Sequence, residues 1–119
     1  MASYLFQLEP GEQLIFDEAG GWYKSKWQVH VGQIYLTNKR ILFVKDPPPV
    51  FGLLSILFRK AGRQLTHDIP LTSVSQYHNE HFGVFKNIIV FSCSDGESFK
   101  FRTKQQYEVW DKKLKELQA

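Results

Sequence analysis

The residues best suited to metal binding or acid–base chemistry are four histidines and one cysteine. His78 and His81 flank Asn79-Glu80, a spacing of three. On a β-strand this spacing places the two rings on opposite faces, so they cannot bind one metal ion together. A zinc site usually contains a closely spaced pair of cysteine or histidine ligands, and no such pair is present. We therefore predict no metal site, and we expect the histidines to lie on the surface or in loops.

Cys93 is the one thiol, and it alternates with Ile89 and Phe91. This alternation predicts a side chain that faces the core, where cysteine behaves as a small hydrophobe. A nucleophile needs a base held by a third group, and no local motif supplies one. No glycine-rich loop precedes a helix to hold phosphates. The sequence therefore predicts no catalytic residues, no cofactor and no enzymatic activity.

The length and composition are those of one small globular domain, which we assign to residues 1–119. Of the 119 residues, 43% are hydrophobic and 15% are aromatic, so the core needs no disulfide. One cysteine cannot form an internal disulfide, and no segment reaches the roughly 20 apolar residues that span a bilayer. We therefore expect a cytoplasmic protein.

The charge is unevenly distributed, although the net charge is only +3. Residues 20–63 contain eight basic residues and a single acid, Asp46. Such a stretch favours an anionic partner such as lipid headgroups or nucleic acid, and the alternative is a solvated face of lysines. Aromatic residues interleave with Lys24 and Lys26, as they do in β-sheets whose rings stack on the bases of a nucleic acid. A strand with half of its rings in the core gives the same pattern, so we expect no nucleic acid.

Short apolar runs separated by turn residues predict a small antiparallel β structure from Glu12 to Arg102. We expect Gly20-Gly21 and Gly32 to lie in turns. The expected strands are Gln13–Glu18, Trp22–Val31, Gln33–Thr37, Arg40–Lys45, His67–Leu71, Val74–His81, Lys86–Ser94 and Glu97–Arg102.

The last predicted hairpin has two possible registers. A two-residue turn at Asp95-Gly96 scatters the large apolar residues, whereas a three-residue loop, 94–96, pairs Phe91 with Phe99 and Ile89 with Phe101 on one face. We choose the second register, with Gly96 in the left-handed conformation.

The C-terminus has a helical pattern. Thr103 to Gln106 has the form of a capping box, and an apolar stripe follows at helical spacing. We predict a helix over Lys104–Leu117 that packs on the sheet, with Trp110 facing inward. The stripe consists of Tyr107, Trp110, Leu114 and Leu117.

An insertion at 46–64 interrupts the strand pattern. Pro47–Pro49 is followed by Val50–Phe58, in which seven of nine residues are large and apolar, and then by Arg59, Lys60 and Arg63. No polar face exists at strand or helix spacing. Three interpretations remain open: a wedge that inserts into one leaflet of a membrane, an oligomer interface, or a short helix folded over the open edge of the barrel.

The order of these segments resembles GRAM and bacterial pleckstrin-homology-like domains. The most specific stretch is Leu36-Thr37-Asn38-Lys39-Arg40-Ile41-Leu42-Phe43, with Trp110 in the final helix. The resemblance implies a bent antiparallel barrel of two near-orthogonal sheets, about seven strands, closed by a C-terminal helix. It also implies a non-catalytic module that binds lipid headgroups or proteins. Lipid-binding members carry bases around the first hairpin loop, whereas Asp17-Glu18-Ala19-Gly20-Gly21 is acidic here, so we expect no specific polyphosphoinositide pocket.

Two functional hypotheses follow. The first is a peripheral membrane adaptor on the inner face of a membrane, held by the insertion and by bases that meet an anionic surface. The second is a protein-interaction or homo-oligomer module that uses the same insertion. The predicted binding residues are Phe51, Leu53, Leu54, Ile56, Leu57, Phe58, Arg59, Lys60, Arg63, Lys24 and Lys26.

Overall fold

Seven β-strands and a C-terminal α-helix form the part of the chain that the structure describes. The computed structural model describes residues 6–25, 27–46 and 64–118. A short 3-10 helix, η1 (Leu71–Ser73), lies between the fourth and fifth strands. The other elements are β1 (Leu14–Ser25), β2 (Gln28–Thr37), β3 (Arg40–Lys45), β4 (Gln64–Pro70), β5 (Val74–Phe82), β6 (Phe85–Cys93), β7 (Ser98–Arg102) and α2 (Tyr107–Gln118).

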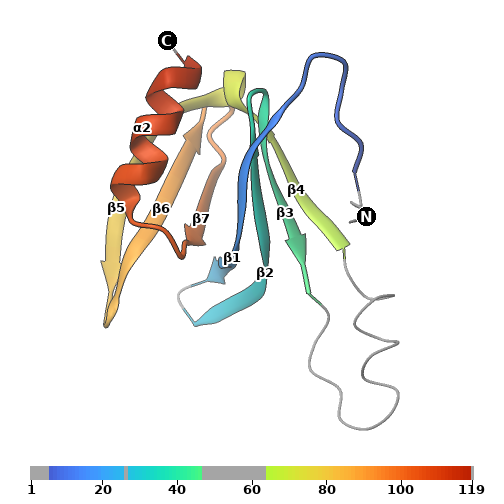
Figure 1. Cartoon of the computed structure of the whole chain (residues 1–119). Coiled ribbons are helices and arrows are strands. Elements are labelled where there is room, and N and C mark those ends of the chain that lie inside the picture. The colour runs from blue at the N-terminus through green and yellow to red at the C-terminus, as the bar shows by residue number, and fades with distance from the viewer. Residues whose placement is uncertain (1–5, 26, 47–63, 119) are drawn as a thin grey trace, which may run out of the picture.

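The strands form one continuous, bent antiparallel sheet in the order β4-β3-β2-β1-β7-β6-β5. Figure 1 shows β1–β4 and β5–β7 as two halves that face each other, with α2 beside β5 and β6. The halves are joined by β1 and β7, which pair at Gly21↔Arg102 and Trp22↔Phe101. The predicted mainly β fold with one C-terminal helix is confirmed, although hydrogen bonds link the two expected sheets into one.

The core lies between the two halves and under the helix. Ile34 and Phe43 contribute from one half, Phe91 and Phe101 from the other, and all four are fully buried. Trp110 of α2 is also fully buried, and its ring packs edge-on against Phe16 at a centroid distance of 4.8 Å. The predicted inward position of Trp110 is confirmed.

The helix begins later than predicted because its start depends on a distant carboxylate. The Thr103 hydroxyl donates to the carbonyl of Gln105 at 2.9 Å, so it does not form the expected capping box. Glu18 binds this region instead. Its carboxylate accepts from the backbone N–H of Gln105 at 2.8 Å and from Trp110 Nε1 at 2.6 Å. Glu18 therefore connects β1 to α2.

The last hairpin has the predicted register. Phe91 pairs with Phe99, and Ile89 pairs with Phe101. Gly96 has φ +92°, in the left-handed region that favours glycine. Cys93 is buried in the core, as its alternation predicts.

The first hairpin differs from the expectation. β1 runs without a break through Gly20-Gly21 to Ser25, and β2 begins at Gln28. The glycines allow close approach instead of a turn: a Cβ on Gly20 would lie 2.5 Å from Ile34 Cδ1 and 2.6 Å from the carbonyl oxygen of Arg102. The predicted acidic loop is therefore wrong, because Asp17 to Gly21 lie within β1.

The most specific segment of the family resemblance has a structural role at the β2–β3 turn. The Glu12 carboxylate accepts from Arg40 Nε at 2.8 Å and from the Thr37 hydroxyl at 2.6 Å. Burial alone raises the pKa of Glu12, but the hydrogen bonds from Arg40, Thr37 and the backbone of Glu9, with the charge of Arg40, outweigh burial and lower the pKa to about 2. Arg40 also pairs with Asp68 at 2.9 Å.

Candidate functional site

The basic stretch of the sequence divides into two groups in space. Arg40 is bound by Glu12 and Asp68, and Lys39 Nζ donates to the carbonyl of Pro10 at the same turn. Lys24 lies near the end of β1, and Lys45 is the last residue of β3. Both are at the end of the barrel away from the β2–β3 turn. Neither forms an ion pair with a carboxylate of the described residues. They are therefore the bases better placed to meet an external anion.

Lys24, His30 and Lys45 form a basic cluster at the end of the barrel where the β1–β2 turn lies. Pairing places His30 opposite Trp22 and Lys45 opposite Gly32. Residues that are paired across two strands lie on the same face of the sheet, and so do residues two apart in one strand. Trp22, His30, Gly32 and Lys45 therefore lie on one face. Burial lowers the pKa of His30, and the charges of Lys45 and Lys24 lower it further. The three side chains are thus close enough to repel one another when all are charged, and a shared anion would relieve this repulsion.

An aromatic floor lies beneath the basic cluster. The Trp22 ring stacks on His30 at a centroid distance of 5.3 Å and contacts His67 edge-on at 4.3 Å. Phe99 and Phe101 complete the surroundings of His67. Burial lowers the pKa of His67 to about 4, so this ring is neutral at pH 7. The expectation that the histidines lie on the surface or in loops is wrong for His67, because these aromatic residues of β1 and β7, together with Phe43 of β3, enclose it.

The insertion begins and ends beside this cluster. Lys45 pairs with Gln64, so the first and last residues of the insertion, Asp46 and Gln64, lie at the same end of the β3–β4 pair (Figure 1). Of the predicted binding residues, the structure describes only Lys24. The others lie outside the described residues: Lys26, Phe51, Leu53, Leu54, Ile56, Leu57, Phe58, Arg59, Lys60 and Arg63.

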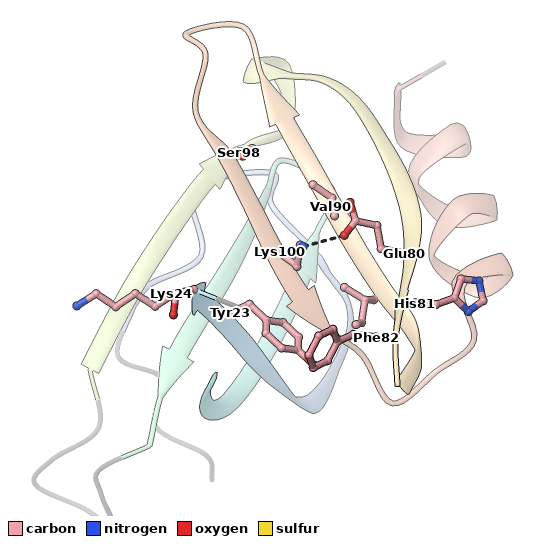
Figure 2. A pocket seen from close by; sticks show the side chains of 10 residues that line it. Tyr23, Lys24, Glu80, His81, Phe82, Val90, Ser98 and Lys100 are labelled. Atoms are coloured by element: carbon pink, nitrogen blue, oxygen red, sulfur yellow. Dashed lines mark ion pairs between the residues drawn. The ribbon is translucent and has the colours of Figure 1, made fainter. Parts of the chain in front are cut away.

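A groove of about 380 Å³ lies on the other side of the end of β1. Its floor contains Ile88 and Val90, which are buried although they point away from the main core. Figure 2 shows Tyr23 and Phe82 in contact at one end, whereas Lys24 points away from the groove. The remaining lining residues are Ser25, Glu80, His81, Ser98 and Lys100.

The charges inside the groove neutralise one another. Lys100 Nζ lies 2.7 Å from Glu80 Oε1, and His78 Nε2 lies 3.0 Å from Glu80 Oε2. Hydrogen bonds from Lys100 and His78 outweigh burial and lower the pKa of Glu80. The groove therefore combines apolar surface with a carboxylate, Glu80, that is already paired with Lys100 and His78.

Among the described residues, no three histidine, cysteine or acidic side chains are grouped closely enough to hold a metal ion. Nor does the described part of the chain include a helix long and apolar enough to cross a membrane. Burial raises the pKa of the Cys93 thiol, and this disfavours the reactive thiolate.

Sequence reasoning missed His30 and Lys45 as members of the basic cluster. Lys45 lies at the end of β3, and only the β2–β3 register brings it next to His30. The available signal was the turn at Asn38-Lys39, from which the register of Gly32 with Lys45 follows by counting outwards.

The comparisons with known proteins identify the fold. The chain matches no family model, and no curated protein matches by sequence. Among solved structures, the C-terminal domain of an unknown protein from Leishmania infantum matches with a TM-score of 0.64 and 12% identity, over 92% of this chain and 88% of that one. The N-terminal PH domain of Vps36 matches with a TM-score of 0.62 and 17% identity, over 93% and 82%.

A third match is a DUF1696 family protein with a pleckstrin-homology domain from Shewanella loihica, with a TM-score of 0.53, 16% identity, and coverage of 90% of this chain and 79% of that one. The chain therefore has the pleckstrin-homology-like fold. The more specific resemblance to GRAM domains remains a prediction, since identities this low establish the fold alone.

Proposed function

We propose that this chain is a non-catalytic binding module that attaches peripherally to an anionic membrane surface, with the β1–β2 turn and the basic cluster facing the lipid. The observation that carries this proposal is the clustering of Lys24, His30 and Lys45, which strand register brings close together without a carboxylate partner for either lysine among the described residues. Each base near an anionic surface contributes about 1 kcal/mol to binding. A cytoplasmic location is part of the proposal.

The insertion extends this proposed surface. The described residues on either side of 47–63, Asp46 and Gln64, lie next to Lys45. The proposal is that the apolar run Val50–Phe58 and the basic residues Arg59, Lys60 and Arg63 add to the same surface. Lys26 lies between β1 and β2 in the sequence. A headgroup would meet the bases, and the apolar run would add affinity that salt does not screen.

Vesicle co-sedimentation tests the proposal. The wild-type protein should bind vesicles that contain about 30% phosphatidylserine and should not bind neutral phosphatidylcholine vesicles. Lys24→Gln with Lys45→Gln should weaken binding by about 20–30-fold, as expected from two bases at about 1 kcal/mol each. Lys112→Gln with Lys115→Gln, which removes two exposed bases of α2, is the matched control. Equal binding to neutral and anionic vesicles, or equal loss in both variants, contradicts the proposal.

The alternative is a protein-interaction or self-assembly module that uses the insertion as an interface. The apolar character of Val50–Phe58 supports both functions, so the two are separated by replacing Phe51, Leu54 and Leu57 with serine. Loss of vesicle binding by a folded protein of unchanged mass supports the membrane proposal. Loss of a higher oligomeric mass supports the interface, and loss of stability alone supports a segment folded over the barrel.

A further inference from the structure

Two turns that are distant in the sequence bring large apolar side chains together on the surface. Trp27 of the β1–β2 turn is 84% exposed, and Val84 of the β5–β6 turn is 85% exposed. Phe82 and Phe85 flank Val84 and are also exposed. The Trp27 and Phe82 rings are 6.5 Å apart between centroids. We call Trp27, Phe82, Val84 and Phe85 the turn patch.

The fold does not require apolar residues in this turn. Phe82 pairs with Phe85, so the loop consists of Gly83 and Val84. Gly83 has φ +61°, whereas Val84 has a negative φ. A two-residue hairpin with positive φ only at its first position needs glycine there and accepts a polar residue at the second. A solvent-exposed valine at this point does not help the hairpin form, and exposed apolar patches mark interaction sites.

The charge around the turn patch suits an anionic partner. No acidic residue occurs from Gly20 to Lys45 or from His81 to Ser94. Lys86 is exposed beside Phe85, and the Arg102 guanidinium lies over the Phe85 ring at 4.5 Å from its centroid. The acid nearest in sequence to the β5–β6 turn, Glu80, is neutralised by Lys100. Apolar side chains surrounded by bases match a bilayer interface, where acyl chains lie beneath anionic headgroups.

We propose that the turn patch inserts into the interfacial layer of an anionic membrane, so that the domain lies with its β1–β2 and β5–β6 turns towards the lipid. This inference rests on the proposed function and extends it with an anchor made of folded, described residues. Figure 1 shows both turns at the end of the molecule where β3 ends and β4 begins. Lys24 and Lys45 of the basic cluster belong to the same ends of β1 and β3.

Tryptophan fluorescence measures the insertion directly. Trp110 is fully buried and Trp22 stacks on His30, whereas Trp27 is exposed. Vesicles that contain phosphatidylserine and lipids brominated along the acyl chain should quench the wild-type emission. Trp27→Tyr should remove this quenching and retain binding. Trp27→Ser with Val84→Ser should lower partitioning by at least about tenfold, with unchanged mass and melting temperature. Leu8→Ser with Val109→Ser, which removes two exposed apolar side chains elsewhere, is the matched control and should bind as wild type.

The outcomes separate this inference from the proposed function. One outcome contradicts the turn-patch inference and leaves the proposed function intact. In it, wild-type emission is not quenched and the turn-patch variant binds normally, whereas Lys24→Gln with Lys45→Gln weakens binding. The protein then binds headgroups only. Absence of any binding to anionic vesicles overturns both. A loss of oligomeric mass in the turn-patch variant, with vesicle binding intact, identifies an interface between copies and also overturns the inference.

Discussion

The helix side of the barrel and its turn end use the same residue types in opposite ways. On the helix side, Trp110 is fully buried and donates a hydrogen bond to Glu18. Near the β2–β3 turn, Glu12 forms an ion pair with Arg40. At the turn end, Trp27 is exposed, and Lys24 and Lys45 lack carboxylate partners among the described residues. Rings and charges that satisfy one another stabilise the fold, whereas rings and charges left facing outwards are available for a partner.

The largest effect on stability should come from the helix side. Trp110→Ala should lower the free energy of unfolding by about 3–5 kcal/mol, because it removes a fully buried ring and the Nε1–H that donates to Glu18 Oε1. Urea denaturation of the variant measures this. An unchanged midpoint would mean that α2 does not hold the two halves together, and the distinction between the two regions would fail.

A second effect concerns His67, which lies where the two regions meet. Its pKa is lowered from an ordinary value of 6.5 to about 4 in the folded protein, so the folded state binds fewer protons than the unfolded state between these values. Stability is therefore complete above pH 6.5 and is lost as the pH falls through this window, by about 2 kcal/mol between pH 7.5 and pH 5.

The variant His67→Phe isolates this effect. Its free energy of unfolding should change less between pH 7.5 and pH 5 than that of the wild type, because the residue no longer binds a proton on unfolding. The control His81→Gln, at an exposed position, should keep the wild-type dependence. The same pH dependence in all three proteins would show that other groups cause it.

A smaller effect is expected at the loop between β6 and β7. Gly96→Val should destabilise by about 1–2 kcal/mol, because a β-branched residue is strained at the positive φ of this position. A Cβ at Gly96 meets no atom within 4 Å, so backbone strain alone is tested. A thermal melt that matches the wild type would show that the loop can adopt another turn without cost.

The smallest effect on stability should come from the turn end. Lys24→Gln with Lys45→Gln should change the free energy of unfolding by no more than about 0.5 kcal/mol, as exposed substitutions usually do. A small gain is expected, since the substitutions relieve the repulsion on His30. Parallel urea and vesicle-binding measurements on this variant sharpen the comparison. A large loss of stability would show that these lysines serve the fold.

Local patterns predicted the parts of the fold that depend on neighbours in the sequence. Alternation at Ile89, Phe91 and Cys93, with Gly96 in the turn, was sufficient for the last hairpin. Local patterns gave the wrong prediction where a residue distant in the sequence determines the local structure. Gly20-Gly21 was interpreted as a turn, but these glycines admit Ile34 and the backbone of β7. The role of Glu18 at the start of α2 depends on a contact across most of the chain, which no local motif signals.

The candidate site was predicted less well. Lys24 was identified from the charge distribution, whereas His30 and Lys45 join it only through strand register. The turn patch was missed because Trp27 and Phe82 belong to hairpins whose proximity depends on how the sheet bends.

The short pairing of β1 with β7 has a consequence for how the protein is made. Gly21 and Trp22 meet Arg102 and Phe101 near the other end of the chain, so the step that closes the barrel joins residues of high sequence separation. Such contacts form late, because the entropy of closing a long loop is lost before the contact can compensate for it. During synthesis, β1–β3 can pair as soon as they leave the ribosome, but their apolar inner face stays uncovered until β7 and α2 follow. The nascent chain therefore passes through a stage in which a half-built sheet is open to chaperones and to aggregation.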